Sequence, residues 1–161
     1  MTKGTDSWAI VKSDESDSLI NIERLKFNDK HIALDLDGHA GETVKLLGLL
    51  LGKIQATNTT YVGAGLKLLD DGMTYEQLMS AALDVVLGAN ASSLSVVELI
   101  WNNLIGPPTP ADNIGQYAAL IDNGTYTSAG LAVIAADHSL NTTAIDLVGL
   151  SQTGVEYIPY G

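Results

Sequence analysis

The chain has 161 residues, of which 46% are apolar and 17% charged, and its formal net charge at pH 7 is −11. This length and composition predict a folded chain with a core of its own, and one domain is the first expectation. Cysteine is absent, which excludes disulfides, thiolate metal sites and cysteine nucleophiles. After Lys67 the chain has ten carboxylates and no lysine or arginine, which argues against nucleic-acid binding or phosphate clamping by that stretch.

The sequence has no recognisable membrane-spanning or amino-terminal signal segment. The longest aliphatic run, Leu46 to Leu51, is far too short for a membrane span, so we expect none. The first residues lead directly into polar sequence and lack the pattern of an amino-terminal signal peptide. Because the chain begins inside what resembles a strand repeat, we expect it to be a piece of a longer protein.

Short strands are predicted in the first 38 residues. Trp8 to Val11 is a β-rich run, and apolar and polar residues alternate from Ile20 to Phe27 and again from His31 to Leu36. The polar stretch 28–30 predicts a turn between the two alternating runs. A ribbon of this size is not stable alone, so it must pack on the rest of the chain or continue a preceding β structure. We therefore assign residues 1–38 to the end of a β-repeat region.

The second part of the chain, residues 39–161, follows a helical period. Capping-box patterns at Thr74 and at Ser95 precede two of its helices, and Pro110 suits the first position of another. The predicted helices cover residues 42–54, 59–70, 75–87, 95–105, 110–122, 127–137 and 141–148. The tail from Ser151 to Ile158 is expected to return as an edge strand beside the ribbon.

An internal repeat organises the helical part. Leu69-Asp70-Asp71-Gly72 parallels Ile121-Asp122-Asn123-Gly124, the glycines being 52 residues apart and the leucines that follow them 53. Upstream, Leu51-Gly52 matches Ile105-Gly106 at an offset of 54. Each unit is then a helix, a loop, a helix, an Asp-Asx-Gly turn and a third helix. The predicted fold is mainly α (α+β), with a small amino-terminal β ribbon followed by a helical bundle of two similar units.

Several blocks of the chain resemble a known architecture. They are Asp17 to Asp29, Ile32 to Gly41, Leu99 to Gly106, Leu131 to Asp137 and Ile145 to Tyr157. Together they resemble the junction at which RTX-type or adhesin-like β repeats of large type I-secreted bacterial proteins meet a carboxy-terminal helical module. That module is similar to a domain of unknown function, usually tandem and loosely related to phycobilisome linker domains.

The resemblance implies export through a type I secretion machinery, with an uncleaved signal near the carboxy terminus, and an extracellular or cell-surface location. Two departures bear on it. Residues 53–57 and 107–112 stand where relatives often carry an Arg/Asp/Gly-containing loop, and the Gly/Asp nonapeptides that bind Ca²⁺ in RTX β-rolls are missing. The sequence therefore gives no basis for a role of that loop in this chain.

A cation site is one candidate. Asp35, Asp37 and Glu42 form an Asp-x-Asp-Gly-x-x-x-Glu pattern that can place three oxygen ligands around Ca²⁺. The alternative is that Asp37 or Gly38 starts the first helix and Glu42 stabilises its positive end. The turns at Asp70-Asp71-Gly72 and Asp122-Asn123-Gly124 offer carboxylates too, but they are better explained as helix stops with glycine in the left-handed conformation.

Two further candidates involve histidine. Asp137-His138-Ser139 has the residue types of a hydrolase triad, although neighbours in sequence seldom face one another and no Gly-x-Ser-x-Gly elbow is present. The alternative is a histidine at a helix end. His31 and His39, with Asp35 or Asp37, can form a weak Zn²⁺ or Ni²⁺ site, but no His-x-x-x-His spacing supports one.

The aromatic residues suggest core packing more than a binding surface. Trp101 lies between Leu99 and Leu104 in an apolar helix, so its indole is expected in the core. A set for binding a sugar or a partner is the alternative; it would consist of Trp101, Tyr61, Tyr75, Tyr117 and Tyr126.

We expect a non-enzymatic carboxy-terminal module of a large secreted bacterial protein, which caps the β repeats and supports export and cell-surface attachment. Covering the open end of a β repeat satisfies unpaired backbone groups and buries apolar surface. The alternative is a module that binds a small molecule or peptide in a cleft between the two helical units. A hydrolase needs a nucleophile within hydrogen-bond reach of His138.

Overall fold

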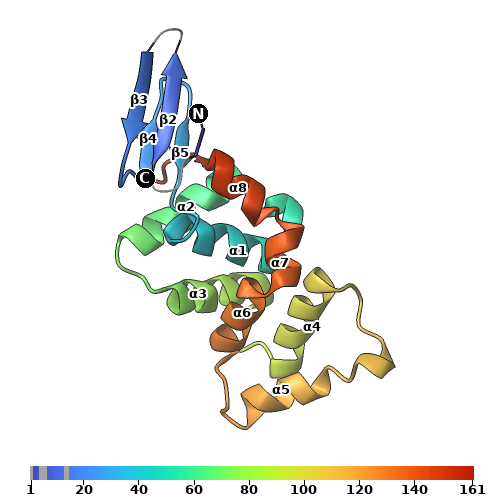
Figure 1. Cartoon of the computed structure of the whole chain (residues 1–161). Coiled ribbons are helices and arrows are strands. Elements are labelled where there is room, and N and C mark those ends of the chain that lie inside the picture. The colour runs from blue at the N-terminus through green and yellow to red at the C-terminus, as the bar shows by residue number, and fades with distance from the viewer. Residues whose placement is uncertain (1, 4–6, 13–14) are drawn as a thin grey trace.

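The computed structural model describes residues 2–3, 7–12 and 15–161 (Figure 1). It is mainly helical, with two small antiparallel sheets, so the predicted fold class is confirmed. The strands gather at one end of the molecule and the helices extend away from them (Figure 1). None of the helices in the described part of the chain has the length and hydropathy needed to cross a bilayer.

Each sheet has three strands. The first has the order β1-β2-β3 and the second the order β4-β5-β6, with β5 paired on both sides. The strands are β1 (Thr2–Lys3), β2 (Trp8–Lys12), β3 (Glu15–Leu19), β4 (Arg24–Lys26), β5 (His31–Ala33) and β6 (Val155–Tyr157). The second sheet therefore joins the ribbon to the last strand of the chain, and the predicted return of the tail beside the ribbon is confirmed.

The predicted strand from Ile20 to Phe27 is wrong in part. β3 ends at Leu19, and β4 covers only Arg24–Lys26, because Asn21 adopts the left-handed conformation (φ 57°) and breaks the strand. The turn that follows is confirmed, since the amide of Phe27 donates to the carbonyl oxygen of Lys30 at 2.8 Å. β5 stops at Ala33 and does not reach Leu36, because the chain turns there into the first helix.

The bundle has eight α-helices and two short 3₁₀ turns among the described residues. They are α1 (His39–Leu51), η1 (Lys53–Gln55), α2 (Thr59–Asp70), α3 (Tyr75–Leu87), α4 (Ser93–Leu104), η2 (Pro110–Asp112), α5 (Gly115–Asp122), α6 (Ser128–Asp137), α7 (Ser139–Ala144) and α8 (Leu147–Thr153). α2 has the predicted bounds. α1 begins three residues earlier than predicted, with Gly38 at its N-cap, and ends at Leu51, three residues earlier than predicted, because Gly52 at its C-cap has a φ of 86°.

Side-chain caps decide the other boundaries. Thr74 caps α3 in the predicted capping box with Gln77. The predicted cap at Ser95 is wrong, because the hydroxyl of Ser92 accepts the backbone N–H of Ser95 and starts α4 earlier. Pro110 opens only the turn η2, and α5 begins later, at Gly115.

The predicted seventh helix is two helices. Asp146 separates α7 from α8; its φ is 53°, which no helix interior allows, and its carboxylate accepts the backbone N–H of Gly149. The two Asp-Asx-Gly turns end α2 and α5 as expected, since φ is 100° at Gly72 and 75° at Gly124.

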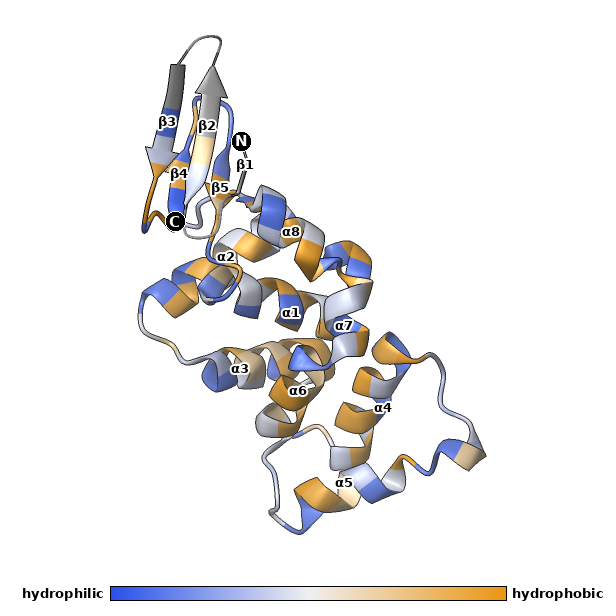
Figure 2. Cartoon of the chain, viewed as in Figure 1, coloured by the Kyte–Doolittle hydropathy of each residue, from blue (hydrophilic) through white to orange (hydrophobic). Residues whose placement is uncertain are grey.

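The repeat is present as two units of the same element order. Helices α1, α2 and α3 with η1 form the first unit, and helices α4, α5 and α6 with η2 form the second. α1 packs against α2, α3, α4 and α6, so it is the central helix of the bundle, and most of its side chains are buried. Figure 2 shows apolar residues along α1, α4 and α6. Asn103 on α4 joins the units by donating to the carbonyl oxygens of Leu49 and Leu50 at the end of α1.

The strand region shares apolar contacts with the bundle. Ala33 of β5 and Val155 of β6 belong to the main helical core, whereas Ile32 and Leu34 pack with Trp8 of β2 in a second, smaller core. The division into residues 1–38 and 39–161 stays a prediction, since β5 and β6 lie on opposite sides of it and pair with each other.

Candidate functional site

Each helical unit holds one apolar cleft. The cleft of the first unit, here called the first cleft, lies between α1, α2 and α3 and has a volume of about 320 Å³. The second cleft lies between α4, α5 and α6, is closed on one side by the start of α7, and has a volume of about 290 Å³. A further pocket of about 560 Å³, with a more polar lining, lies between the units at the ends of α1 and α4, beside η1 and α7. The alternative of a binding cleft between the two units therefore stays a prediction.

The two clefts are lined by equivalent positions of the repeat. On the first helices of the units the offset is 54, and on the third helices it is 53, as in the sequence repeat. The pairs on α1 and on α4 with its C-cap residue are Thr43 and Val97, Leu46 and Ile100, Leu47 and Trp101, Leu50 and Leu104, and Leu51 and Ile105. The pairs on α3 and on α6 with its C-cap residue are Leu78 and Leu131, Ala81 and Ile134, Ala82 and Ala135, and Val85 and His138. The repeat has therefore duplicated a cleft as well as a fold.

The second cleft has three ring-bearing side chains, whereas the first has one, Tyr61. Trp101 replaces Leu47, and Tyr117 replaces Gly65. The rings of Trp101 and Tyr117 lie 5.8 Å apart at 41°, within the range of favourable aromatic pairs. In the first unit glycine is needed instead, since a Cβ on Gly65 would lie 2.6 Å from the methyl group of Thr43.

Trp101 lies at the cleft and outside the fully buried core, contrary to the prediction that its indole is a core side chain. It is partly exposed, although its Nε1 atom is buried and has no hydrogen-bond partner among the described residues. Tyr117 is 36% exposed. Applying the repeat offset to the apolar positions is the sequence signal that finds this site, because it aligns Trp101, Tyr117 and His138 with three smaller residues.

The mouth of the second cleft is apolar and open to water. Ile105 is 57% exposed, Ile134 52% and Leu140 47%, although all three are large aliphatic side chains. His138 stands at the junction of α6 and α7, where its Nδ1 atom accepts the backbone N–H of Leu140 at 3.2 Å. Exposed apolar side chains gathered around one cleft are typical of interaction sites.

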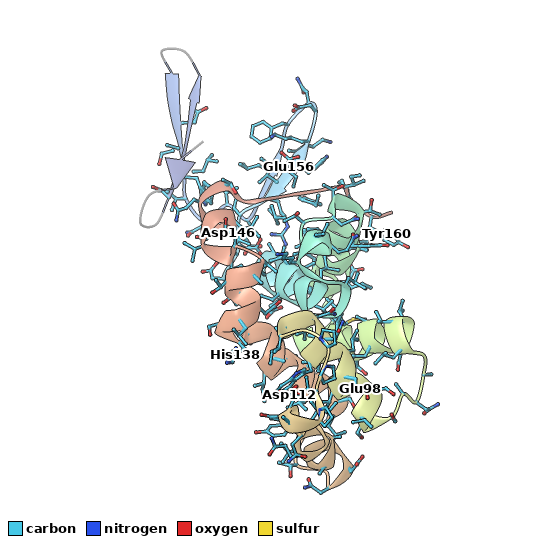
Figure 3. The ribbon with its side chains drawn as sticks, turned by 90° about the vertical axis from the view of Figure 1, so that its right-hand side faces the viewer. Glu98, Asp112, His138, Asp146, Glu156 and Tyr160 are labelled. Carbon is cyan, nitrogen blue, oxygen red and sulfur yellow. The ribbon has the colours of Figure 1, made fainter. Side chains whose placement is uncertain are left out.

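The charged side chains of the second unit are all acidic. They are Glu98, Asp112, Asp122 and Asp137. Asp137 is paired with Lys45 of α1, whereas Glu98 is exposed and has no ion-pair partner among the described residues. Figure 3 shows Glu98, Asp112 and His138 in the half of the molecule away from the strand that carries Glu156.

The proposed calcium ligands are not brought together. Asp35 forms an ion pair with Arg24 and accepts the backbone N–H of Ala40, so its carboxylate is already engaged. Burial raises the pKa of Asp35, and the nearby Arg24 guanidinium opposes that rise. Glu42 lies in the first turn of α1, as the alternative interpretation expected, and Asp37 is exposed. Among the described residues, no three acidic or histidine side chains are placed to hold a metal ion.

The histidine candidates are engaged elsewhere. His39 Nδ1 lies 2.7 Å from a carboxylate oxygen of Asp70, and the ring of His31 contacts that of Tyr157. Asp137 pairs with Lys45, and His138 bonds to backbone. The structure therefore does not assemble the hydrolase triad from Asp137, His138 and Ser139, nor a zinc site from the two other histidines.

Comparison with known proteins gives no relative. The chain matches no protein-family model, no curated protein and no solved structure.

Proposed function

We propose that this chain is a non-enzymatic carboxy-terminal module of a large secreted bacterial protein of the type I, RTX-like kind. It caps the end of a β-repeat region, takes part in export through the type I secretion machinery, and supports attachment at the cell surface. The proposal rests on the resemblance of residues 17–157 to such a junction. Its location is extracellular.

One observation carries the capping role. The last strand of the ribbon, β5, is the central strand of the second sheet. It pairs with β4 on one side and with β6, from the end of the chain, on the other. Ile32 and Leu34 pack against Trp8 on one side, while Ala33 belongs to the helical core. A β region that enters this sheet has its backbone paired and its apolar surface covered, which is what an open repeat end lacks.

The experiment measures export. The chain is expressed in a bacterium that carries a type I secretion apparatus, with and without an inactivating change in the transporter ATPase, and the fraction in the medium is measured. We expect accumulation in the medium that requires the active transporter and is lost when residues 155–161 are removed. Equal retention in the cell with either transporter would overturn the export role.

Binding of a small molecule or peptide is a second candidate function, and the second cleft is the observation that favours it. Its two aromatic rings, apolar lining and open mouth are the features of a preformed binding site. Titration of the chain with small neutral apolar probes such as indole, followed by the amide and indole NMR signals, tests it. We expect the shifts to concentrate on α4, α5 and α6; shifts spread evenly over the chain count against a site.

A further inference from the structure

We infer that the second cleft binds the apolar face of a positively charged amphipathic segment of another protein. This inference rests on the second candidate function, binding in the cleft, and names its partner. A helix or extended segment with apolar side chains on one face and lysine or arginine on the other fits both the lining and the charge of this unit.

The shape of the site favours a segment that lies along the surface. The exposed aliphatic side chains Ile105, Ile134 and Leu140 come from α4, α6 and α7, so they extend the apolar surface over three elements around the aromatic pair. An apolar helix face that docks into such a groove presents anchors at intervals of three and four residues. Trp101 and Tyr117 supply the flat, rigid contact area that commonly dominates the binding energy.

The charge of the second unit favours a basic partner. This unit has four carboxylates and no lysine or arginine of its own. Asp137 is paired with Lys45, which belongs to the first unit. Glu98 lies one helical turn before Trp101 and is exposed. A partner that carries lysine or arginine around its apolar face is attracted to this acidic unit, while an acidic partner is repelled.

The same argument disfavours a second copy of this chain. Each copy carries a net charge of −11, so two acidic units facing each other repel. It also separates the two clefts. The first unit has five carboxylates and three lysines (Lys45, Lys53 and Lys67), a net charge of −2 against −4 for the second unit. Its cleft has one aromatic side chain, Tyr61, and no aromatic pair, so it offers a basic segment a weaker field and different contacts.

The test uses three synthetic peptides of about 18 residues with one leucine face and a polar face of lysine, glutamine or glutamate. Binding to the full chain is measured by calorimetry and by the indole N–H signal of Trp101, assigned with the variant Trp101→Phe. We expect the lysine peptide to bind about tenfold or more tightly than the glutamate peptide. Its affinity should fall as NaCl rises from about 50 mM to about 500 mM.

Matched variants locate the site. Ile134→Asn removes an exposed apolar side chain without a change of charge, and we expect it to weaken binding of the lysine peptide several-fold. Val85→Asn makes the same kind of change to an exposed apolar side chain of the first cleft, where Val85 is 86% exposed, and should leave binding unchanged. Glu98→Gln should weaken binding roughly two- to fivefold, while Asp84→Asn, on exposed surface of the first unit, should not.

The outcomes separate the partner from the site. Equal binding of the three peptides overturns the inference. So does a loss of binding in Val85→Asn together with unchanged binding in Ile134→Asn. If small neutral probes shift the Trp101 signal and no peptide does, the cleft remains a binding site and the charged segment is the wrong occupant. If neither peptides nor probes bind, both the inference and the second candidate function fail.

Discussion

Arg24 connects the ribbon to the bundle at the level of single residues. Its guanidinium pairs with Asp35, between β5 and α1, and with Asp70, at the end of α2. The Asp35 side chain is 12% exposed, whereas that of Asp70 is 45% exposed. Removal of the Arg24 guanidinium would therefore leave a poorly hydrated charge on Asp35 and a well hydrated one on Asp70. The same Asp70 also contacts His39.

Arg24→Gln should lower the free energy of unfolding by about 1–3 kcal/mol at pH 7, because Asp35 loses its counterion. Burial raises the pKa of Asp35, so protonation of this carboxyl favours the folded state. The charged form lowers the free energy of unfolding increasingly as the pH rises above the ordinary pKa of an aspartate. The effect of the variant should therefore shrink as the pH falls towards about 4. Urea unfolding at both pH values measures it.

Lys67→Gln is the matched control for Arg24→Gln. It breaks an exposed pair with Asp71, and the loss should stay within about 1 kcal/mol. An equal loss in both variants would contradict the special role of the pair between Arg24 and Asp35.

Asp112 gives a second prediction at this scale. The backbone N–H and the hydroxyl of Thr109 both donate to its carboxylate, and these bonds lower the pKa of Asp112. The contribution of Asp112 to the stability of the fold is therefore complete at a pH above its ordinary pKa of 3.8. It is lost as the pH falls through the lower pKa of the folded state. Carboxyl NMR titration should show a midpoint below 3.8, which moves part of the way back in Thr109→Val. A midpoint unaffected by the valine would rule out the hydroxyl contribution.

At the scale of elements, the carboxy-terminal tail depends on one glycine of α2. A Cβ on Gly63 would lie 1.7 Å from the carbonyl oxygen of Ile158, whose amide donates to the carbonyl oxygen of Thr59. The tail after β6 can lie along α2 only because this position has no side chain.

Gly63→Ala should therefore destabilise the fold by about 1–3 kcal/mol and increase hydrogen exchange at the amide of Ile158. Gly115→Ala is the control, since a Cβ there meets no atom within 4 Å. It should change the free energy of unfolding by less than about 1 kcal/mol, in the stabilising direction. Similar losses for both variants, measured by urea unfolding, would show that the contact with the tail does not matter.

At the scale of the whole molecule, the uneven charge is the dominant property. A net charge of −11, most of it after Lys67, makes the folded chain repel itself. Screening by salt reduces this repulsion, since the Debye length falls from about 10 Å at 0.1 M to about 3 Å at 1 M.

Raising NaCl from about 20 mM to about 500 mM should stabilise the chain by on the order of 1 kcal/mol, a rise of a few degrees in Tm. Thermal melting followed by circular dichroism measures this change. Calcium matched for ionic strength should give the same rise as NaCl, because Asp35 is already paired with Arg24. A larger rise in Tm with calcium than with NaCl would instead support calcium binding at the predicted site of Asp35, Asp37 and Glu42.

The sequence by itself determined the local features of this protein. The cap at Thr74, the glycine stops at Gly72 and Gly124 and the order of elements in the repeat follow from interactions between residues a few positions apart. The boundaries that were missed depend on single backbone angles or caps. Asn21 and Asp146 adopt left-handed conformations, and Ser92, rather than Ser95, is the N-cap of α4.

The tertiary structure alone decided which distant residues meet. Trp101, Tyr117 and His138 share a cleft because α4, α5 and α6 pack around it, and the carboxylate of Asp35 faces Arg24 because β4 pairs with β5. The sequence predicted that apolar side chains would be buried, but not that Ile134 and Leu140 would stay exposed at the mouth of that cleft. Packing between helices decides exposure, and it depends on the summed shapes of side chains far apart in the chain.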